Sequence, residues 1–255
     1  MANIPISRTS RSSILPMGSD GDGNQIGNLI LRNLPRKECA LLVSSLEFVR
    51  LRLRQILHEA GDTIRSVYFL NQGVGSVLIV QPDGKSVEVG LVGREGFVGL
   101  PVIFGFKSSG LRIVTQADAT AYRMDTQVLL KALPQCPVLQ LQLQRYSMIL
   151  GMQTTQLAAC NRLHNVIERL ARWLLMTQDL VDSKTMPMTH EFLGQMLGTR
   201  RAGVSEAAGH LQQAGTISYT RGSVTVLNRA KLEHSACNCY GIIQEQKERW
   251  LQETQ

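Results

Sequence analysis

Four polar side chains near the C-terminus are spaced so that they could contact a polyanion. Thr189 can cap one helix, and Thr199 can cap a second helix that opens with Arg200 and Arg201. Free backbone N–H groups at the start of a helix bind phosphate, and an arginine can donate two hydrogen bonds to a guanine edge. The pattern therefore predicts a surface that reads duplex DNA.

The two helices that must position these side chains have apolar residues at helical spacing. Gly198 stands between them, where the first helix must end and the chain must turn sharply. Small residues on the inner face let two helices cross closely, as a helix-turn-helix requires. The inward positions are Phe192, Leu193, Met196 and Leu197 in the first helix and Val204, Ala207, Ala208 and Leu211 in the second.

A hairpin with a basic tip is predicted after Gly215, from apolar runs at 217–219 and 224–227 around Arg221 and Gly222. It completes a winged helix-turn-helix over residues 165–240, with a recognition helix at 200–213. Two helices and a hairpin could also be only a packing unit, but the exposed arginines favour DNA binding. The candidate DNA-binding residues are Thr189, Thr199, Arg200, Arg201, Gly203, Ser205, His210, Arg221 and Ser223.

A long helix is predicted from Val138 onward, because apolar residues recur at alternating spacings of four and three. This heptad pattern is typical of a coiled-coil seam. We expect a parallel homodimer seam, rather than a helix packed on its own domain. Residues 136–164 would form this dimerisation helix and a hinge, and Asn165 with Glu168 forms a capping box that predicts a new helix. The seam residues are Leu139, Leu143, Tyr146, Leu150, Gln153 and Leu157.

Residues 28–135 have the pattern of short strands with turn residues between them. After a helical segment broken at Pro35, strands are expected at 49–54, 67–70, 77–80, 87–91, 112–115 and 120–124. Such spacing favours a small antiparallel β-roll. We expect a mobile tail at 1–27 and a helical tail at 241–255, so the predicted fold class is α+β.

The formal net charge of +7 over 255 residues suits a polyanionic partner such as nucleic acid. Residues 188–230, however, carry only four arginines against two glutamates, so the spacing of residues supports DNA binding better than bulk charge does. No apolar run reaches roughly 18 residues, and no apolar stretch follows Arg8 and Arg11. We expect no membrane span, no secretory signal and a cytoplasmic location.

Metal binding and catalysis are not expected. The cysteines are odd in number and scattered, which argues against a disulfide framework. Cys237 and Cys239 form the only close pair, and neither a second pair nor a well-spaced histidine completes a zinc site in the sequence. His58 is interpreted as a packed residue. No catalytic triad order or phosphate loop occurs, so we predict neither an enzyme nor a cofactor. The cysteines are Cys39, Cys136, Cys160, Cys237 and Cys239.

The order of these elements resembles the Crp/Fnr family of bacterial transcription regulators over about residues 29–240. Residues 188–204 carry the closest likeness, reading Met-Thr-His-Glu-Phe-Leu-Gly-Gln-Met-Leu-Gly-Thr-Arg-Arg-x-x-Val. The resemblance implies a homodimer, a palindromic DNA site, RNA polymerase as a partner, and a guanine contact by Arg201. A glutamate that often follows in the family is Ala202 here, and a later arginine is Glu206, which puts the family's usual operator sequence in doubt.

The expected sensor domain departs from the family's cyclic-nucleotide binders. These place a glutamate just after Phe-x-Gly and an Arg-Ser or Arg-Thr further on, whereas here Gly99 is followed by Leu100 and the arginine position holds Leu111. A leucine cannot pair with a phosphate charge. We expect no tight cyclic AMP binding and an unidentified effector or none, with Gly99, Leu100, Leu111 and Arg112 as the candidate pocket. The alternative is a cyclic-nucleotide-responsive regulator that uses Arg112 in an altered pocket.

Overall fold

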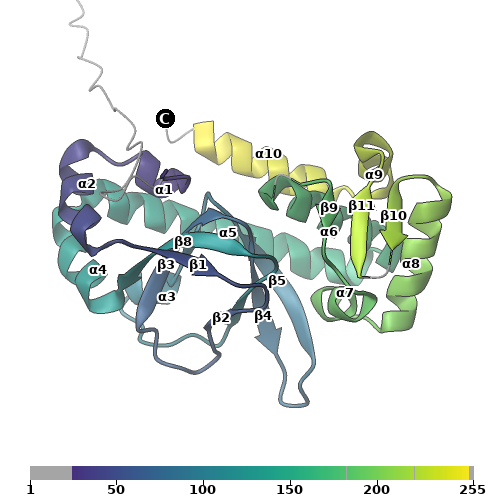
Figure 1. The fold of residues 1–255 in the computed structure, drawn as a ribbon, viewed down its shortest axis with the longest axis horizontal. Coiled ribbons are helices and arrows are strands. Elements are labelled where there is room, and N and C mark those ends of the chain that lie inside the picture. The colour runs from purple at the N-terminus through teal and green to yellow at the C-terminus, as the bar shows by residue number, and fades with distance from the viewer. Residues whose placement is uncertain (1–24, 182, 221, 253–255) are drawn as a thin grey trace, which may run out of the picture.

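Two four-stranded antiparallel sheets form the β-roll, in the orders β1-β8-β3-β6 and β2-β7-β4-β5 (Figure 1). The computed structural model describes residues 25–181, 183–220 and 222–252. The apolar face of each sheet must be covered, and the two sheets cover each other. The strands are β1 (Glu47–Leu51), β2 (Ile56–His58), β3 (Ser66–Gln72), β4 (Gly75–Val80), β5 (Ser86–Val92), β6 (Phe97–Val98), β7 (Arg112–Thr115) and β8 (Ala119–Asp125).

Aromatic residues fill the centre of the β-roll. Phe69 lies opposite Tyr122 in the β3–β8 register, and its ring lies 4.9 Å from that of Phe97. All three side chains are buried. His58 is buried as well and its ring nitrogen lies 2.7 Å from the Ser66 carbonyl, as expected for a packed histidine.

Short helices close the ends of the β-roll. Ile26 is buried, and the Asn71 side chain accepts hydrogen bonds from the backbone of Gly27 and Asn28. The expectation of a mobile tail up to residue 27 is therefore wrong for 25–27, and its remainder lies outside the described residues. The helical segments are α1 (Leu29–Arg32), α2 (Arg36–Leu42), η1 (Val43–Ser45), α3 (Leu100–Ile103), α4 (Thr126–Ala132) and η2 (Leu133–Gln135).

The long helix α5 (Pro137–Leu163) packs along its own β-roll, and this corrects the predicted dimer seam. Leu139 and Leu143 are fully buried in the β-roll core, and the Gln153 side chain accepts a hydrogen bond of 2.7 Å from the Leu91 amide. The heptad spacing selects one face of the helix, and a sheet of the same chain covers that face. The seam residues that turn inward are Leu139, Leu143, Tyr146, Leu150, Gln153 and Leu157.

The second domain begins with α6 (Val166–Val181). The predicted capping box is confirmed, because the Asn165 amide donates to the Glu168 carboxylate at 3.0 Å and the Glu168 amide donates back to Asn165 at 3.1 Å. Trp173 on this helix is buried at the centre of the domain core. The other elements are β9 (Thr185–Met186), α7 (His190–Leu197), α8 (Arg201–Gln213), β10 (Ile217–Thr220), β11 (Ser223–Val226), α9 (Arg229–Ser235) and α10 (Cys239–Gln252).

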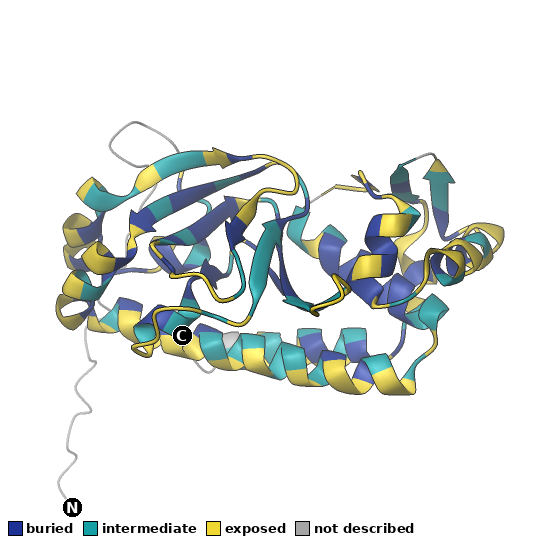
Figure 2. Ribbon diagram, turned by 90° about the horizontal axis from the view of Figure 1, so that it is seen from below, coloured by how far each residue is buried: buried dark blue, intermediate teal, exposed yellow. Residues whose placement is uncertain are grey.

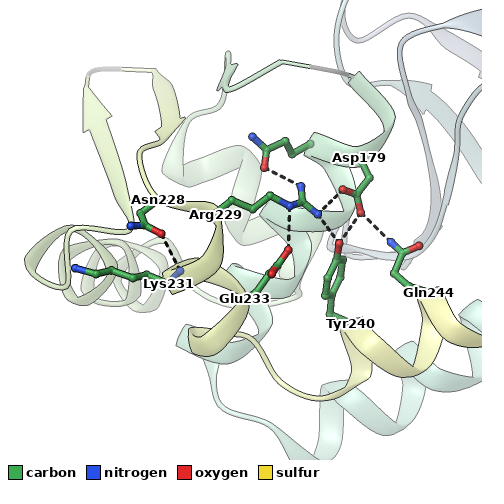
Figure 3. A network of polar contacts seen from close by, with 8 residues as sticks. Asp179, Asn228, Arg229, Lys231, Glu233, Tyr240 and Gln244 are labelled. Atoms are coloured by element: carbon green, nitrogen blue, oxygen red, sulfur yellow. Dashed lines mark hydrogen bonds and ion pairs between the residues drawn. The ribbon is translucent and has the colours of Figure 1, made fainter.

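The last helix, α10, returns to contact α5 and α6 (Figure 1). Lys247 forms an ion pair of 3.2 Å with Glu95 of the β-roll. At the other end of α10, Arg229 donates to Asp179 at 2.7 Å and to the Tyr240 hydroxyl at 2.6 Å, so that α6, α9 and α10 share one polar network (Figure 3). Helix α10 thus connects the second domain to the first.

Two further contacts join the domains where β4 and β5 meet the second domain. The buried carboxylate of Glu88 accepts hydrogen bonds from Trp173 Nε1 at 2.8 Å and from Ser76 Oγ at 2.7 Å. Val87 lies against Gly198, at the turn between α7 and α8.

Among the described helices, none has the length and apolar character that crossing a bilayer requires.

Candidate nucleic-acid interface

The first helix of the predicted pair, α7, is capped as the sequence indicates. Thr189 Oγ1 accepts a hydrogen bond of 3.1 Å from the Phe192 amide, which confirms the cap. Gly198 ends the helix in the left-handed region at φ +59°, which glycine adopts without a steric penalty. A Cβ on Gly194 would lie 3.0 Å from the Thr199 carbonyl oxygen, so this glycine permits the close approach of the turn.

The recognition helix starts one residue later than predicted. Arg200 is the N-cap residue of α8 and makes no side-chain cap, so the expected cap by Thr199 is wrong. The Thr199 amide instead donates to the Gly194 carbonyl at 2.9 Å, which makes Thr199 part of the turn. Gly203 leaves room for the Thr199 hydroxyl, 3.3 Å from where its Cβ would stand.

Two exposed arginines stand at the N-terminus of α8. Arg200 and Arg201 are both exposed, beside backbone N–H groups that have no partner within the helix. Val204 and Leu211, in contrast, are buried in the domain core, so α8 has one face inside and one face free. The free side of the first turns can therefore donate hydrogen bonds to phosphate and to base edges.

The remaining candidates on α8 differ in their position relative to Arg201. Ser205 is exposed one turn after Arg201, and its hydroxyl donates to the Arg201 carbonyl at 3.1 Å. Glu206 is exposed beside it. His210 is exposed too, but nine residues separate it from Arg201, which at 3.6 residues per turn places it half a turn around the helix. His210 therefore does not lie in one patch with Arg201.

Sequence reasoning missed two aromatic residues beside this face. The rings of His190 and Tyr219 stack with centroids 4.0 Å apart, and His190 Nδ1 lies 2.8 Å from Ser205 Oγ. Burial lowers the pKa of His190, and the nearby Arg201 lowers it further. The only sequence signal was the place of His190 directly after the Thr189 cap.

The wing is a hairpin of β10 and β11, joined to β9 in a three-stranded sheet. The Tyr219 amide donates to the Gln212 side chain at 2.7 Å, which ties the wing to α8. The Ser223 hydroxyl donates to the Met186 carbonyl at 3.5 Å, so it faces the domain. Arg221 lies outside the described residues.

The candidate effector residues are already engaged within the β-roll. Arg112 Nε donates to both carboxylate oxygens of Glu59, at 2.9 and 3.0 Å, and this ion pair lowers the pKa of Glu59. Leu100 and Leu111 pack against the apolar core. Gly99 has a φ of +122° and opens α3. Arg112 is therefore already paired with a carboxylate of its own chain.

The structure brings together a group that the sequence analysis did not expect. Cys160 and His164, at the end of α5, meet Cys237 and Cys239, which adjoin the start of α10. The possible ligand atoms of all four lie within 4.8 Å of one another. The conclusion that no histidine or further cysteine accompanies the Cys237 and Cys239 pair is therefore wrong. The pairing depends on the return of α10 to α5, which spacing alone does not reveal.

Comparisons with known proteins match two domain families, one before and one after the long helix α5. Residues 48–136 match the cyclic nucleotide-binding domain, and residues 168–235 match the Crp-like helix-turn-helix domain. No protein of curated function matches the chain.

Several solved structures share the fold. A putative Crp/Fnr regulator from Eubacterium rectale has a TM-score of 0.65 at 15% identity, over 81% of this chain and 96% of that one. A Crp-family regulator from Thermus thermophilus has a TM-score of 0.62 at 20% identity, over 74% and 96%. The c-di-GMP-responsive regulator CLP of Xanthomonas campestris has a TM-score of 0.63 at 16% identity, over 74% and 97%.

Proposed function

We propose, from the premise that the chain belongs to the Crp/Fnr family of transcription regulators, that it binds a palindromic DNA site as a homodimer. It is a regulator of this type, with a cyclic-nucleotide-binding domain followed by a DNA-binding helix-turn-helix. The two half-sites would lie about 34 Å apart, one turn of the duplex. RNA polymerase is the second partner that family membership supports.

The observation that carries the proposal is the free N-terminus of α8. Arg200 and Arg201 are exposed there, while Val204 and Leu211 of the same helix are buried in the domain core. We assign Arg201 to a guanine edge and Arg200 to the phosphate backbone. Glu206 can accept a hydrogen bond from the amino group of cytosine, which would give this regulator a base preference of its own.

The outer face of α5 supports the dimer. Its inner face is occupied by the β-roll, while exposed residues follow its outer face (Figure 2). Leu141 and Met148 on α5 are 45% and 63% exposed. Gly151 and Thr155 follow at spacings of three and four and are also exposed. Apart from the backbone of α5 itself, no atom of the described residues lies within 4 Å of where a Cβ on Gly151 would stand, so a second helix could approach closely. A second copy of α5 is the partner that this stripe fits.

The effector is proposed to differ from cyclic AMP. A cyclic phosphate needs a positive partner, but Arg112 is paired with Glu59, and the half-buried Leu111 packs against the core and offers no charge. Isothermal titration with cyclic AMP and cyclic GMP is expected to give no binding heat. Heat that disappears in Arg112→Ala would instead support the altered cyclic-nucleotide pocket.

Selection of genomic DNA fragments by the purified protein tests the function. The wild type is expected to enrich a palindrome, and Arg201→Ala is expected to lose that enrichment. Arg52→Ala removes the same charge from an exposed position of the β-roll and should leave the selection unchanged. If Arg201→Ala enriches the same palindrome as the wild type, α8 does not read the site as assigned.

A further inference from the structure

Three cysteines and one histidine meet where α5 ends, at the junction of the two domains. Cys160 Sγ lies 3.4 Å from Cys237 Sγ, and Cys239 Sγ lies 3.6 Å from His164 Nδ1. The three cysteines are buried, and the histidine is half-buried. None of these residues belongs to the helix-turn-helix surface, so the proposed DNA contacts leave them without a role.

We propose that Cys160, His164, Cys237 and Cys239 bind one divalent transition-metal ion, with zinc as the best match to this donor set. Structural zinc sites are tetrahedral, with Zn–S bonds of about 2.3 Å, which places neighbouring sulfur atoms about 3.8 Å apart. The observed spacing of 3.4 to 4.8 Å between donors fits such a site after small side-chain shifts. Iron–sulfur clusters hold several iron atoms between their cysteines and need wider spacing.

The four proposed ligands come from two separate segments of the chain. Cys160 and His164 are four residues apart and so lie on the same side of α5, one turn from each other. His164 is the C-cap residue of the helix, so its ring can adjust more freely than one within the helix. Cys237 lies in the segment between α9 and α10, and Cys239 is the first residue of α10.

The surroundings suit a negatively charged metal–thiolate centre. A zinc ion with three thiolates and a neutral histidine carries a net charge of about −1. Arg172 is buried nearby, and within the described parts of the chain no carboxylate lies at ion-pair distance from it. Gln156 Nε2 donates a hydrogen bond of 3.1 Å to Cys239 Sγ, a contact that stabilises a thiolate ligand.

Metal analysis of the full-length protein tests the site. Protein purified under reducing conditions, incubated with Zn²⁺ and desalted, is expected to keep one zinc ion per protomer. Co²⁺ in place of Zn²⁺ should give the visible and thiolate-to-metal absorption of tetrahedral cobalt. Cys237→Ser and His164→Asn are expected to lose both signals. Cys136→Ser is the matched control, because Cys136 is equally buried but lies at the other end of α5.

Circular dichroism and size-exclusion chromatography establish whether each variant is folded. If Cys237→Ser does not fold, His164→Asn carries the comparison, because that side chain is only half-buried. The proposal is overturned if the reduced wild type keeps no zinc after desalting and shows no cobalt absorption. It is also overturned if mass spectrometry finds a Cys160–Cys237 disulfide and no metal in the protein as isolated. Equal metal content in the wild type and a folded His164→Asn would remove His164 from the ligand set.

Discussion

At the start of α8, two adjacent arginines are expected to contribute differently to DNA binding. Replacing Arg201 by alanine should cost about 1–3 kcal/mol on the selected site and relax the preference at one base pair. Replacing Arg200 should weaken binding to all sequences alike and reduce the salt dependence by about one phosphate contact. Fluorescence anisotropy on the selected and a scrambled duplex, over a range of salt, measures both effects.

Comparing the two variants distinguishes a loss of base preference from a general loss of DNA affinity. Arg201→Ala should keep its affinity for the scrambled duplex within a few-fold, so the ratio of the two affinities falls. An unchanged ratio in Arg201→Ala, or a reduced ratio in Arg200→Ala, would mean that the assignments are reversed or wrong.

Glu88 is a buried carboxyl at the contact between the domains. Burial raises its pKa to about 7, although hydrogen bonds from Ser76, Trp173 and Gln116 and the charge of Arg172 act in the opposite direction. The folded protein therefore holds a proton on Glu88 that the unfolded chain releases above its ordinary pKa of 4.5. The resulting stability is complete below pH 4.5 and is lost as the pH rises through about 7.

We expect Glu88→Gln to remove this part of the pH dependence. The wild type should lose stability relative to the variant between pH 5 and 8, by an amount of the order of 3 kcal/mol at most. Thermal unfolding of both proteins across that range measures the difference, in which shared contributions such as that of His58 cancel. Glu59→Gln is the control, because the pKa of Glu59 is lowered and its effect falls below pH 4.5. Parallel profiles for the wild type and Glu88→Gln would contradict the protonated carboxyl.

For single residues, the sequence predicted those whose role depends on residues close by in the chain. The Thr189 cap and the exposed Arg201 depend on residues within one helical turn, and both are where the pattern placed them. His190 and the cysteine group depend on contacts between distant segments. Tyr219, which stacks on His190, is 29 positions later in the chain, and no local periodicity records such a contact.

Among the elements, α5 carries the clearest prediction for assembly. Met148→Glu would place a charge in the middle of the exposed stripe and oppose it to the same charge in the second copy. We expect the dimer to weaken at least tenfold, which corresponds to about 1.4 kcal/mol. Analytical ultracentrifugation over a concentration series measures this change.

A matched control separates dimerisation from solubility. Leu227 is 61% exposed in the second domain, close to the 63% of Met148, and Leu227→Glu should leave the dimer unchanged. If Met148→Glu remains as dimeric as the wild type, the outer face of α5 is not the interface.

The polar network around Arg229 predicts how firmly α10 is held (Figure 3). Arg229→Ala removes the hydrogen bonds to Asp179, Glu233 and Tyr240. Because these groups are partly exposed, we expect less than about 1 kcal/mol of global destabilisation but faster amide hydrogen exchange throughout α10. Lys231→Ala is the control, since the Lys231 side chain points away from the network in Figure 3. Unchanged exchange in α10 would show that the network does not hold the helix.

The error over α5 illustrates what periodicity can and cannot predict. Leu139, Leu143 and Leu157 follow a heptad because one face of a helix must be apolar wherever it is covered. The covering surface can be a second chain or the chain's own sheet, and both select the same spacing. The exposed stripe of Leu141 and Met148 was hidden in the sequence by the stronger inner pattern.

In the whole molecule, the domain order could be predicted, whereas the contacts between the domains could not. Strand spacing, the capping box and the helix pair indicate separate units along the chain. Contacts such as Val87 with Gly198 and Lys247 with Glu95 join residues far apart in sequence. Any signal that reorients the second domain must change these contacts, because they connect it to the β-roll.

The late position of α10 also affects the order of events during synthesis. Domains generally fold from the N-terminus as the chain leaves the ribosome, so the β-roll and α5 can form long before Cys237 and Cys239 are made. The cysteine group is therefore completed only when the last segment emerges. A premature stop after the wing would release a chain that contains its recognition helix but lacks Cys237, Cys239 and the contacts of α10 with α5. Closure of the junction thus depends on the synthesis of α10.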